Sequence, residues 1–310
     1  MNGVMVVIGT NDLDEYYEMD TVPVMGDKVV CKFLETKVGG MLANAAAVYA
    51  GYGCKTYMID CVNGGPQSEN MERELRECGV DTSYFSVDAS LSDPRCLIML
   101  KGGERVIFVM DRKKRDLKLT ADQGRLIAEA DIVYSSLSEL RAFGAEEHIT
   151  ERIVASGAKL ALDVEAGTLA EPEKDFLLLG WADYLFINSG SHRRLSELYG
   201  GDYGERLREM GAALVYTKGS RGCSVCAGDG EPIHVPGYKV KAVDTTGAGD
   251  TFNASFLYGV SRGWTLRECA EFANAAAARA IGFMGARGGV ATEAAVEQFK
   301  EQFLTGGNQS

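Results

Sequence analysis

Residues 243–256 read VDTTGAGDTFNASF, and their types are unusual for a protein core. Gly247, Ala248 and Gly249 are small enough for consecutive backbone N–H groups to point inward and hold anionic oxygens. The apolar run that follows predicts a helix whose positive N-terminal end points at the same place. Asp250 lies at the start of this helix, where a carboxylate beside an anion-binding loop can act as a general base. The segment therefore predicts phosphoryl transfer to a hydroxyl group.

A second glycine-containing segment precedes another expected helix. Gly39 and Gly40 come before the alanine-rich run MLANAAAVYA, so the backbone there can approach a ligand closely. Asn44 is a poor helix former in the first turn or so of that helix, and its amide suits a polyhydroxyl ligand. The competing interpretation is structural: Asp250 caps its helix and the glycines only turn the chain. Residue types and spacing leave both interpretations open.

The composition indicates a globular enzyme rather than a binder of polyanions. The chain has 310 residues, of which 46% are hydrophobic and 25% charged, and its formal net charge is −12. This acidity argues against nucleic acid and against an anionic membrane surface as partners. The eight cysteines are scattered without the spacing of a zinc site, and no leader or membrane-spanning run is visible. We expect a reduced, cytoplasmic protein that binds a small molecule.

Strand-like and helical runs alternate along most of the chain. The strand candidates ADIVYSS, AKLALDVE, ADYLFIN and AALVYTKG are separated by helical stretches, which predicts a doubly wound α/β fold with a mostly parallel sheet. Residues 12–37 alternate in hydrophobicity and residues 95–110 read as a hairpin around Gly102 and Gly103, so we expect them to form a small β-sheet lid. One domain over residues 1–310 is expected, with the ligand beyond the carboxyl ends of the strands. Helices are expected near 121–130, 146–157, 168–180, 191–211, 249–262, 265–284 and 292–303.

Taken together, the motifs resemble those of the ribokinase-like (PfkB) carbohydrate kinases. DTTGAGDTF resembles the C-terminal signature of that family, and the Gly-Gly…Asn element at 39–44 resembles its N-terminal signature. YTKGSRGCSV at 216–225 resembles the nucleotide-contacting strand and turn, and GTNDLD, FINSG and AIGFMGARGG fall in matching order, so the resemblance covers about residues 3–303. It implies a three-layer α/β kinase fold with a β-sheet lid, a homodimer formed through the lid, and ATP-dependent phosphorylation of a primary hydroxyl of a sugar or sugar-like molecule.

The resemblance also implies roles for individual residues. The catalytic base and its anion hole are expected at Asp250, Gly247, Ala248 and Gly249. The phosphate acceptor is expected at Asp14, Gly39, Gly40 and Asn44. ATP, with Mg²⁺ bound to its phosphates, is expected at Asn188, Thr217, Gly219, Arg221 and Asn274. A monovalent cation such as K⁺ is expected at Asp244, Thr246, Ala280, Phe283, Gly285 and Gly289.

The chain departs from the family pattern at three places. Ser191 stands where the family usually carries the Glu of N-x-x-E, a residue expected to organise Mg²⁺ and phosphate. Met41 and Leu42 stand where ribokinases tend to have Lys and a small residue, which either disfavours ribose as the acceptor or reflects neutral drift. RKKR at 112–115 follows the hairpin and suits either a phosphorylated acceptor or a solvated charge run.

Two further functions compete with the sugar kinase. A nucleoside kinase presents the same hydroxymethyl chemistry, and Tyr16, Tyr17 and Phe33 supply aromatic side chains in the expected lid. A non-catalytic sugar-binding or regulatory relative is favoured only by Ser191 and is opposed by the intact DTTGAGD. A dehydrogenase is excluded, because the first strand leads into GTNDLD rather than G-x-G-x-x-G.

Overall fold

An eight-stranded sheet forms the centre of the protein, with strand order β14-β13-β12-β11-β10-β9-β1-β4. The computed structural model describes residues 3–102, 104–110 and 116–306, so Gly103 and the RKKR motif at 112–115 lie outside the described residues. The six strands from β4 to β12 pair in parallel, and β13 and β14 add an antiparallel edge. The prediction of a mostly parallel sheet is confirmed. The strands are β1 (Val4–Ile8), β4 (Lys55–Ile59), β9 (Ile132–Ser136), β10 (Lys159–Val164), β11 (Tyr184–Ile187), β12 (Ala213–Thr217), β13 (Cys223–Cys226) and β14 (Ile233–Val235).

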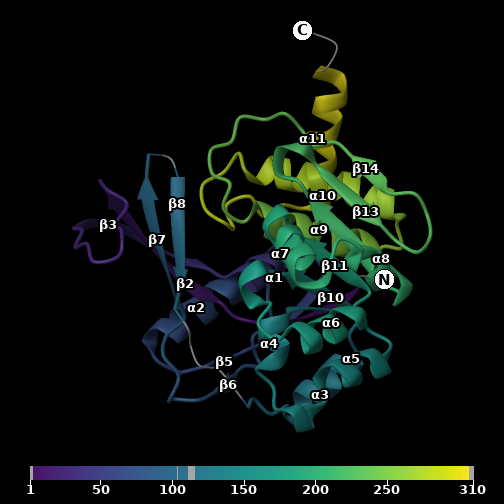
Figure 1. Ribbon diagram of the computed structural model, residues 1–310, viewed down its shortest axis with the longest axis horizontal. Helices are drawn as coiled ribbons and strands as arrows, with labels where there is room; N and C mark the ends of the chain where they lie inside the picture. The colour runs from purple at the N-terminus through teal and green to yellow at the C-terminus, as the bar shows by residue number, and fades with distance from the viewer. Residues whose placement is uncertain (1–2, 103, 111–115, 307–310) are drawn as a thin grey trace.

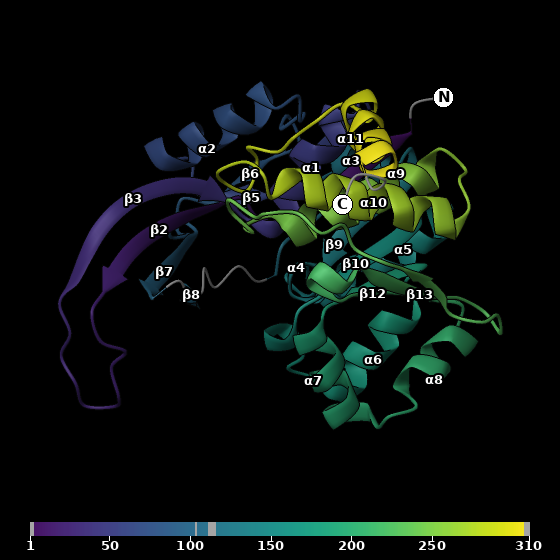
Figure 2. The same cartoon turned by 90° about the horizontal axis from the view of Figure 1, so that it is seen from above.

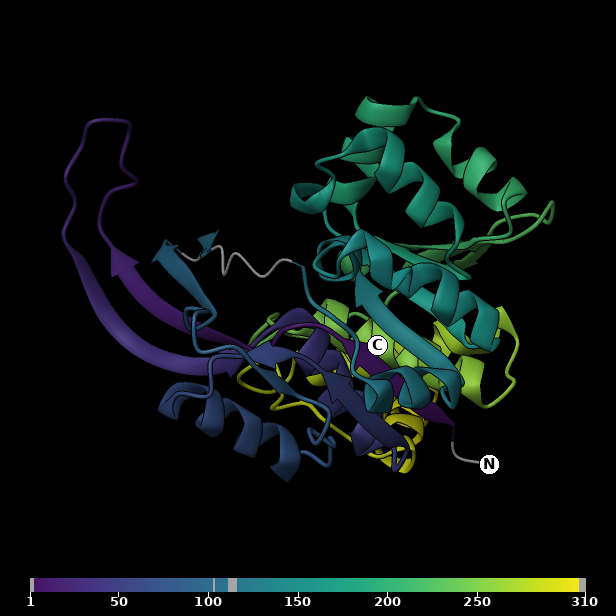
Figure 3. The same cartoon turned by 90° about the horizontal axis from the view of Figure 1, so that it is seen from below.

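Helices cover both faces of this sheet, which gives the three layers that Figures 2 and 3 show. Alternate side chains of one strand supply two separate cores, because strand side chains point to opposite faces. In β1, Met5 and Val7 belong to one core, and Val6 and Ile8 belong to the other. The first core is shared with α1 (Met41–Gly51), α2 (Pro66–Glu77), α9 (Ala248–Ser261), α10 (Leu266–Ala280) and α11 (Glu293–Gly306). The second is shared with α3 (Ala121–Ala128), α4 (Leu137–Arg141), α5 (Ile149–Ser156), α6 (Pro172–Gly180), α7 (Ser189–Tyr199) and α8 (Tyr203–Glu209).

Two expected helices had wrong bounds, and one short helix was missed. The stretch expected at 191–211 is two helices, α7 and α8, because glycines at 200 and 201 interrupt it. The helix expected over 265–284 ends at Ala280, since four glycines between 281 and 289 disfavour its continuation. The short helix α4, directly after β9, was not expected. The loop after Ala280 stands in place of the expected end of that helix, and it returns to the side of the molecule where the ligand is expected to bind.

The smaller sheet stands apart from the helical layers (Figure 1). Its strand order is β3-β2-β7-β8, with β2 and β7 parallel and the two outer pairs antiparallel. The strands are β2 (Asp12–Met19), β3 (Cys31–Gly39), β7 (Arg95–Lys101) and β8 (Glu104–Val109). This sheet corresponds to the expected lid. The remaining short elements are β5 (Cys61–Val62), β6 (Ser86–Val87) and the 3₁₀ turns η1 (Ala145–Glu147), η2 (Ala166–Thr168) and η3 (Gly219–Arg221).

Strand β8 has an exposed apolar surface. Val106, Ile107 and Phe108 are 43%, 47% and 48% exposed, and Val109 is 73% exposed. Such a row of apolar side chains at a sheet edge is unusual on an isolated soluble domain. Across the described residues, none of the helices has the length and apolar character that crossing a lipid bilayer requires.

Candidate active site

A cavity of about 690 Å³ lies beyond the carboxyl ends of β1, β9 and β10. The lid strands form its opposite wall, and the first turns of α1 and α9 close one end. This is the position at which ligands bind in doubly wound sheets. Residues that line it include Asp14, Gly40, Asn44, Ile98, Arg105, Glu139, Arg141, Glu165, Thr246 and Asp250.

Asp250 lies in the first turn of α9, and its carboxylate points to α1 rather than back to its own helix. Its Oδ2 accepts a hydrogen bond of 2.8 Å from Nδ2 of Asn44. No side-chain hydrogen bond caps α9 in the described structure, and its N-cap is Gly247 with φ 75°. A Cβ on Gly247 would lie 2.5 Å from the carbonyl oxygen of Ala286, so this tight approach requires glycine. The capping interpretation of Asp250 therefore fails.

Burial raises the pKa of Asp250 to about 6. The negative charges of Glu165 and Asp14 act in the same direction, whereas the Asn44 hydrogen bond and the positive charge of Arg287 lower the pKa. The carboxylate is therefore mostly ionised at neutral pH and remains basic enough to accept a hydroxyl proton.

Arg287 connects the base to the acceptor side of the cavity. Its Nε donates to Oδ1 of Asn44 over 2.9 Å, and its Nη2 donates to Oδ1 of Asn11 over 2.7 Å and to the Gly39 carbonyl over 2.8 Å. Asn11 in turn donates to the Met71 carbonyl over 2.9 Å. Sequence reasoning missed both Arg287 and Asn11. Their only sequence signals were an arginine in the glycine-rich GARGG and a polar residue directly after β1.

Asp14, which the sequence analysis expected at the acceptor site, lies on β2 beside the glycine pair. A Cβ on Gly39 would lie 2.2 Å from Oδ2 of Asp14, so the carboxylate occupies the space that a larger residue would need. Burial raises the pKa of Asp14, partly offset by its hydrogen bond with Cys96. Asp14, Asn44 and Asp250 all line the same cavity.

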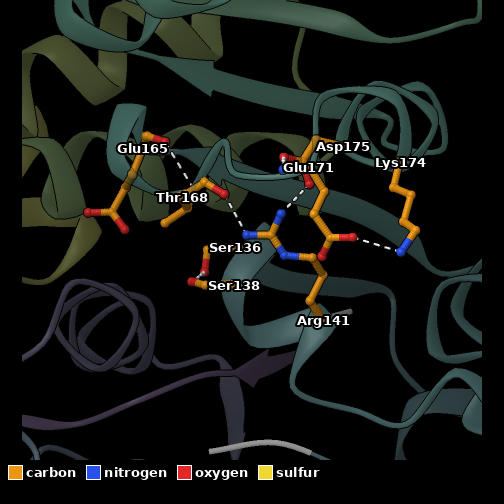
Figure 4. A network of polar contacts seen from close by, with 8 residues as sticks. All are labelled: Ser136, Ser138, Arg141, Glu165, Thr168, Glu171, Lys174 and Asp175. Carbon is orange, nitrogen blue, oxygen red and sulfur yellow. Dashed lines mark hydrogen bonds and ion pairs between the residues drawn. The ribbon is translucent and has the colours of Figure 1, made fainter. Parts of the chain in front are cut away.

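Glu165 reaches the cavity from the loop after β10, which a buried ion pair holds in place (Figure 4). Arg141 of α4 forms an ion pair with Asp175, which is fully buried, and also donates to the Thr168 carbonyl. Thr168 donates to the Glu165 carbonyl over 2.9 Å. This network was not visible in the sequence, because its members lie on three separate elements.

A second buried carboxyl lies behind Asp250. Asp163, at the end of β10, accepts hydrogen bonds from Nδ2 of Asn253 over 2.7 Å and from the Tyr134 hydroxyl over 3.2 Å. Burial, with the nearby charges of Glu165 and Asp250, raises the pKa of Asp163 to about 8. At neutral pH Asp163 is therefore largely protonated.

Four of the residues expected to bind ATP lie at or just beyond the ends of β11 and β12, Asn274 lies on α10, and none of the five lines the 690 Å³ cavity. Asn188 caps α7, because its Oδ1 accepts from the N–H groups of Gly190 and Ser191 over 2.9 and 3.0 Å. Thr217 ends β12, and the residues at 219 and 221 are exposed in η3. Asn274 is buried and donates to two backbone carbonyls, at 235 and 236, over 3.2 and 3.3 Å, so its amide nitrogen is already used within the protein.

The expected cation ligands come from two segments, one just before α9 and one at and after the end of α10, and the contact between Asp244 and Gly285 joins the two. Asp244 accepts from the N–H of Thr246 and from the N–H of Gly285, each over 2.9 Å. Burial opposes ionisation of Asp244, but these hydrogen bonds outweigh it and lower its pKa. The Ala280 and Gly289 carbonyls accept from the Phe283 N–H and the Arg279 side chain, each over 3.0 Å. In the described part of the chain, no three His, Cys, Asp or Glu side chains form a group that suits a metal ion.

Comparison with known proteins shows the family of the chain. The model for the pfkB family carbohydrate kinases matches residues 4–293. The chain belongs to the PfkB family of carbohydrate kinases. It is 28% identical to a ribokinase of Bacillus subtilis over 299 residues, which are 94% of this chain and 97% of that protein. It is 24% identical to a nucleoside kinase of Methanothermobacter thermautotrophicus over 305 residues, 96% of each chain.

The fold of this kinase is also that of solved ribokinases. The structure of Arabidopsis thaliana ribokinase complexed with ribose and ATP has a TM-score of 0.81 and 24% identity, and the alignment covers 96% of this chain and 99% of that one. The predictions of an α/β ribokinase-like fold with a lid and of a sugar kinase are confirmed at this level.

One sequence departure and one aromatic pair of the expected lid have a clear structural setting in this PfkB kinase. Ser191 is fully buried in the first turn of α7 and donates to the Val164 carbonyl, so it supports β10 and does not face solvent. The aromatic residues Tyr17 and Phe33 pack edge-on against each other, with ring centroids 5.5 Å apart, and neither lines the cavity.

Proposed function

We propose that this kinase transfers the γ-phosphoryl group of ATP to a primary hydroxyl of a sugar, with Asp250 as the general base. The observation that supports this best is the position of Asp250, next to the glycine-rich turn and facing the cavity through its contact with Asn44. A base with a pKa of about 6 is ionised when the acceptor arrives, and it can take the hydroxyl proton as that oxygen attacks phosphorus.

The residues around Asp250 have complementary roles in this proposal. The acceptor is held by Asp14, Asn44 and the glycine pair at 39 and 40, while the backbone N–H groups of residues 247–249 stabilise the charge on the transferred phosphoryl group. Closure of the lid excludes water and favours transfer over hydrolysis. Mg²⁺, bound to the phosphates of ATP, supplies charge neutralisation. The nucleotide is held by Asn188, Thr217, Gly219 and Arg221, with Asn274 supporting the adenine side through the backbone at 235 and 236.

We also propose that the loop after α10 holds a monovalent cation. One ionised carboxylate, Asp244, bonds to the N–H of Gly285 in this loop. Neutral oxygens are offered by the Thr246 carbonyl beside Asp244 and by the carbonyls of Ala280, Phe283, Gly285 and Gly289. A single negative charge with neutral oxygens suits K⁺ better than a divalent ion, which favours more carboxylates.

The exposed apolar row of β8 supports a homodimer formed through the lid. Val106 and Phe108 lie on an edge strand that a second copy can cover, whereas Ile107 and Val109 line the cavity on the other face. Sedimentation of the Phe108→Glu variant tests this: the parent is expected to be a dimer and the variant a monomer. Val154→Glu, at an exposed apolar residue of α5, is the matched control and should not change the mass.

A nucleoside remains the second candidate acceptor, since the chain aligns over its length with a nucleoside kinase. The cavity favours a sugar, because carboxylates of Asp14, Glu139 and Glu165 line it and suit a polyhydroxyl ligand, whereas Tyr17 and Phe33 do not reach it.

The deciding experiment is a coupled ADP-release assay over a panel of sugars, sugar phosphates and nucleosides, with Mg²⁺ and with or without K⁺. We expect turnover with a sugar, dependent on Asp250 and stimulated by K⁺. Turnover with nucleosides alone would assign the second candidate. Absence of turnover with every acceptor, while ligands still raise the melting temperature, would instead support a non-catalytic sugar-binding relative.

A further inference from the structure

Two described contacts fix which way the Asn44 amide faces, one with Arg287 and one with Asp250. A side-chain amide has one oxygen and one nitrogen of similar shape, and it can be placed in either of two orientations. Arginine carries donors and no acceptor, so the atom facing Nε of Arg287 at 2.9 Å must be the amide oxygen. The nitrogen is thereby directed to Asp250, which accepts it over 2.8 Å.

In the reverse orientation, an acceptor would face an acceptor at one end of the amide and a donor would face a donor at the other end. The Asn44 oxygen would face the Asp250 carboxylate, and its NH₂ group would face the Arg287 N–H. Either contact leaves buried polar groups without a partner, which is unfavourable. Asn44 itself is only 4% exposed, so water offers little relief.

Arg287 is in turn held rigidly by other contacts. Its Nη2 donates to Asn11 and to the Gly39 carbonyl, and a planar guanidinium with three such bonds has little freedom. Its Nη1 is buried and has no acceptor among the described residues. Burial of a cation with one unpaired nitrogen is a costly way to stabilise a fold, which indicates a role beyond stability.

We infer that Arg287 is a positioning residue for the phosphoryl-transfer reaction: it orients Asn44 so that Asn44 donates to the general base Asp250. The inference rests on the proposed function of Asp250. Arg287 does not act as a base or acid itself. It acts through Asn44, and its positive charge also helps to keep Asp250 ionised.

Several charged groups surround the base and set its response to pH. Asp14 from β2 and Glu165 from the loop after β10 disfavour ionisation of Asp250, and Arg287 favours it. The negative charge of Asp250 helps to raise the pKa of Asp163, at the end of β10. Asp163 accepts hydrogen bonds from Tyr134 of β9 and from Asn253, one turn along α9. Burial lowers the pKa of Arg287, and this is partly offset by Cys78, the C-cap of α2, and by Glu74 of that helix. Loss of the Arg287 charge should therefore raise the pKa of Asp250.

The test compares Arg287→Gln and Arg287→Lys, each alone and combined with Asn44→Ala. At pH values above the acid limb of the pH profile, Asp250 is ionised in every variant. There Arg287→Gln is expected to lower kcat by about 10- to 100-fold, because Asn44 no longer donates correctly to Asp250. In the Asn44→Ala background the same change should cost less than about threefold, because coupled residues are not additive. The acid limb should move to higher pH by about one unit with Gln, and by less with Lys, which keeps the charge.

Arg206→Gln is the control for a purely structural arginine, since Arg206 bonds to the Tyr199 carbonyl and stacks on Phe176 without contacting Asn44 or Asp250. It should change the melting temperature without moving the acid limb. The inference would be overturned if Arg287→Gln lowered kcat equally in the parent and in the Asn44→Ala background, or if it left the acid limb of the pH profile in place. If Arg287→Gln does not fold, the same cycle with Arg287→Lys decides. Retained turnover in Asp250→Asn would instead refute the proposed base itself.

Discussion

The proposed acceptor side and the proposed nucleotide side of this site are built differently. On the acceptor side, Asn11 and Asn44 are 2% and 4% exposed, and the side-chain oxygen of each accepts a hydrogen bond from the cationic Arg287. On the nucleotide side, Asn188 and Arg221 are exposed at strand ends. The acceptor side is preorganised, whereas the nucleotide side relies on few side chains and on backbone groups. Disturbance of the acceptor side should therefore be far more costly.

The largest effect is expected from Asp250→Asn. An amide cannot take the hydroxyl proton, so kcat should fall by about 10³- to 10⁴-fold. ATP binding, measured by isothermal titration calorimetry, should stay within about twofold of the parent, since the proposed nucleotide residues lie on β11 and β12. A comparable loss of ATP affinity would mean that the two sides are not separate.

The next largest effect is expected from Gly39→Ala. Its Cβ would lie 2.2 Å from Oδ2 of Asp14, so the carboxylate must move by about 1 Å, a displacement that can cost about 100-fold. The acceptor KM should rise about 10- to 100-fold while the ATP KM is unchanged. Gly124→Ala is the control, because its added Cβ meets nothing within 4 Å. Equal effects of both variants would show that the glycine pair is not specific to the acceptor.

The pH profile should show the base directly. Because the pKa of Asp250 is raised to about 6, kcat should be constant above pH 7 and fall about tenfold per unit below pH 6. Folding responds in the opposite sense: the folded state keeps the Asp250 proton longer than the unfolded state, so this group lowers stability as pH rises from about 4 to 6. Asp250→Asn should thus have a higher melting temperature than the parent at pH 8, with no gain at pH 4.

These contrasts also explain which parts of the site were predictable. Asp250 and the glycine-containing turn at 247–249 are contiguous, so local spacing was enough to place Asp250 at the start of a helix, where the structure also has it line the cavity. Arg287 lies 243 residues from Asn44 in the chain, and only the return of the loop after α10 brings the two together. No local pattern marks such a contact.

The same limit applies to the sheets and the ion pair. Alternation of strands and helices predicted the parallel order in general, because it follows from βαβ connections. The parallel pairing of β2 with β7 joins segments that no hairpin turn connects, and it was not expected. The buried pair of Arg141 and Asp175 likewise depends on how α4 and α6 pack, which residue types alone do not determine.

A moderate effect is expected on the nucleotide side. Arg221 is exposed in η3, so Arg221→Ala removes a solvated charge rather than a buried one. The ATP KM should rise about three- to tenfold, as for loss of one charged hydrogen bond, and the acceptor KM should not change. Initial-rate measurements with each substrate varied in turn test this. A larger rise in the acceptor KM would contradict the separation of the two sides.

The smallest effect is expected from Ser191→Ala. Ser191 replaces the usual acidic residue of the family, yet it is fully buried and donates to the Val164 carbonyl, so its hydroxyl supports the end of β10. Its loss leaves that carbonyl without this donor and should lower the free energy of unfolding by about 1 kcal/mol, measured in urea. Ser196→Ala removes an exposed hydroxyl of the same helix, which bonds the His192 carbonyl over 2.9 Å, and should cost less. The KM for ATP in the presence of Mg²⁺ should stay within about twofold in both variants, because a hydroxyl occupied inside the protein does not reach the phosphates. A tenfold change with Ser191→Ala alone would place Ser191 in the nucleotide site after all, and the nucleotide side would then be as preorganised as the acceptor side.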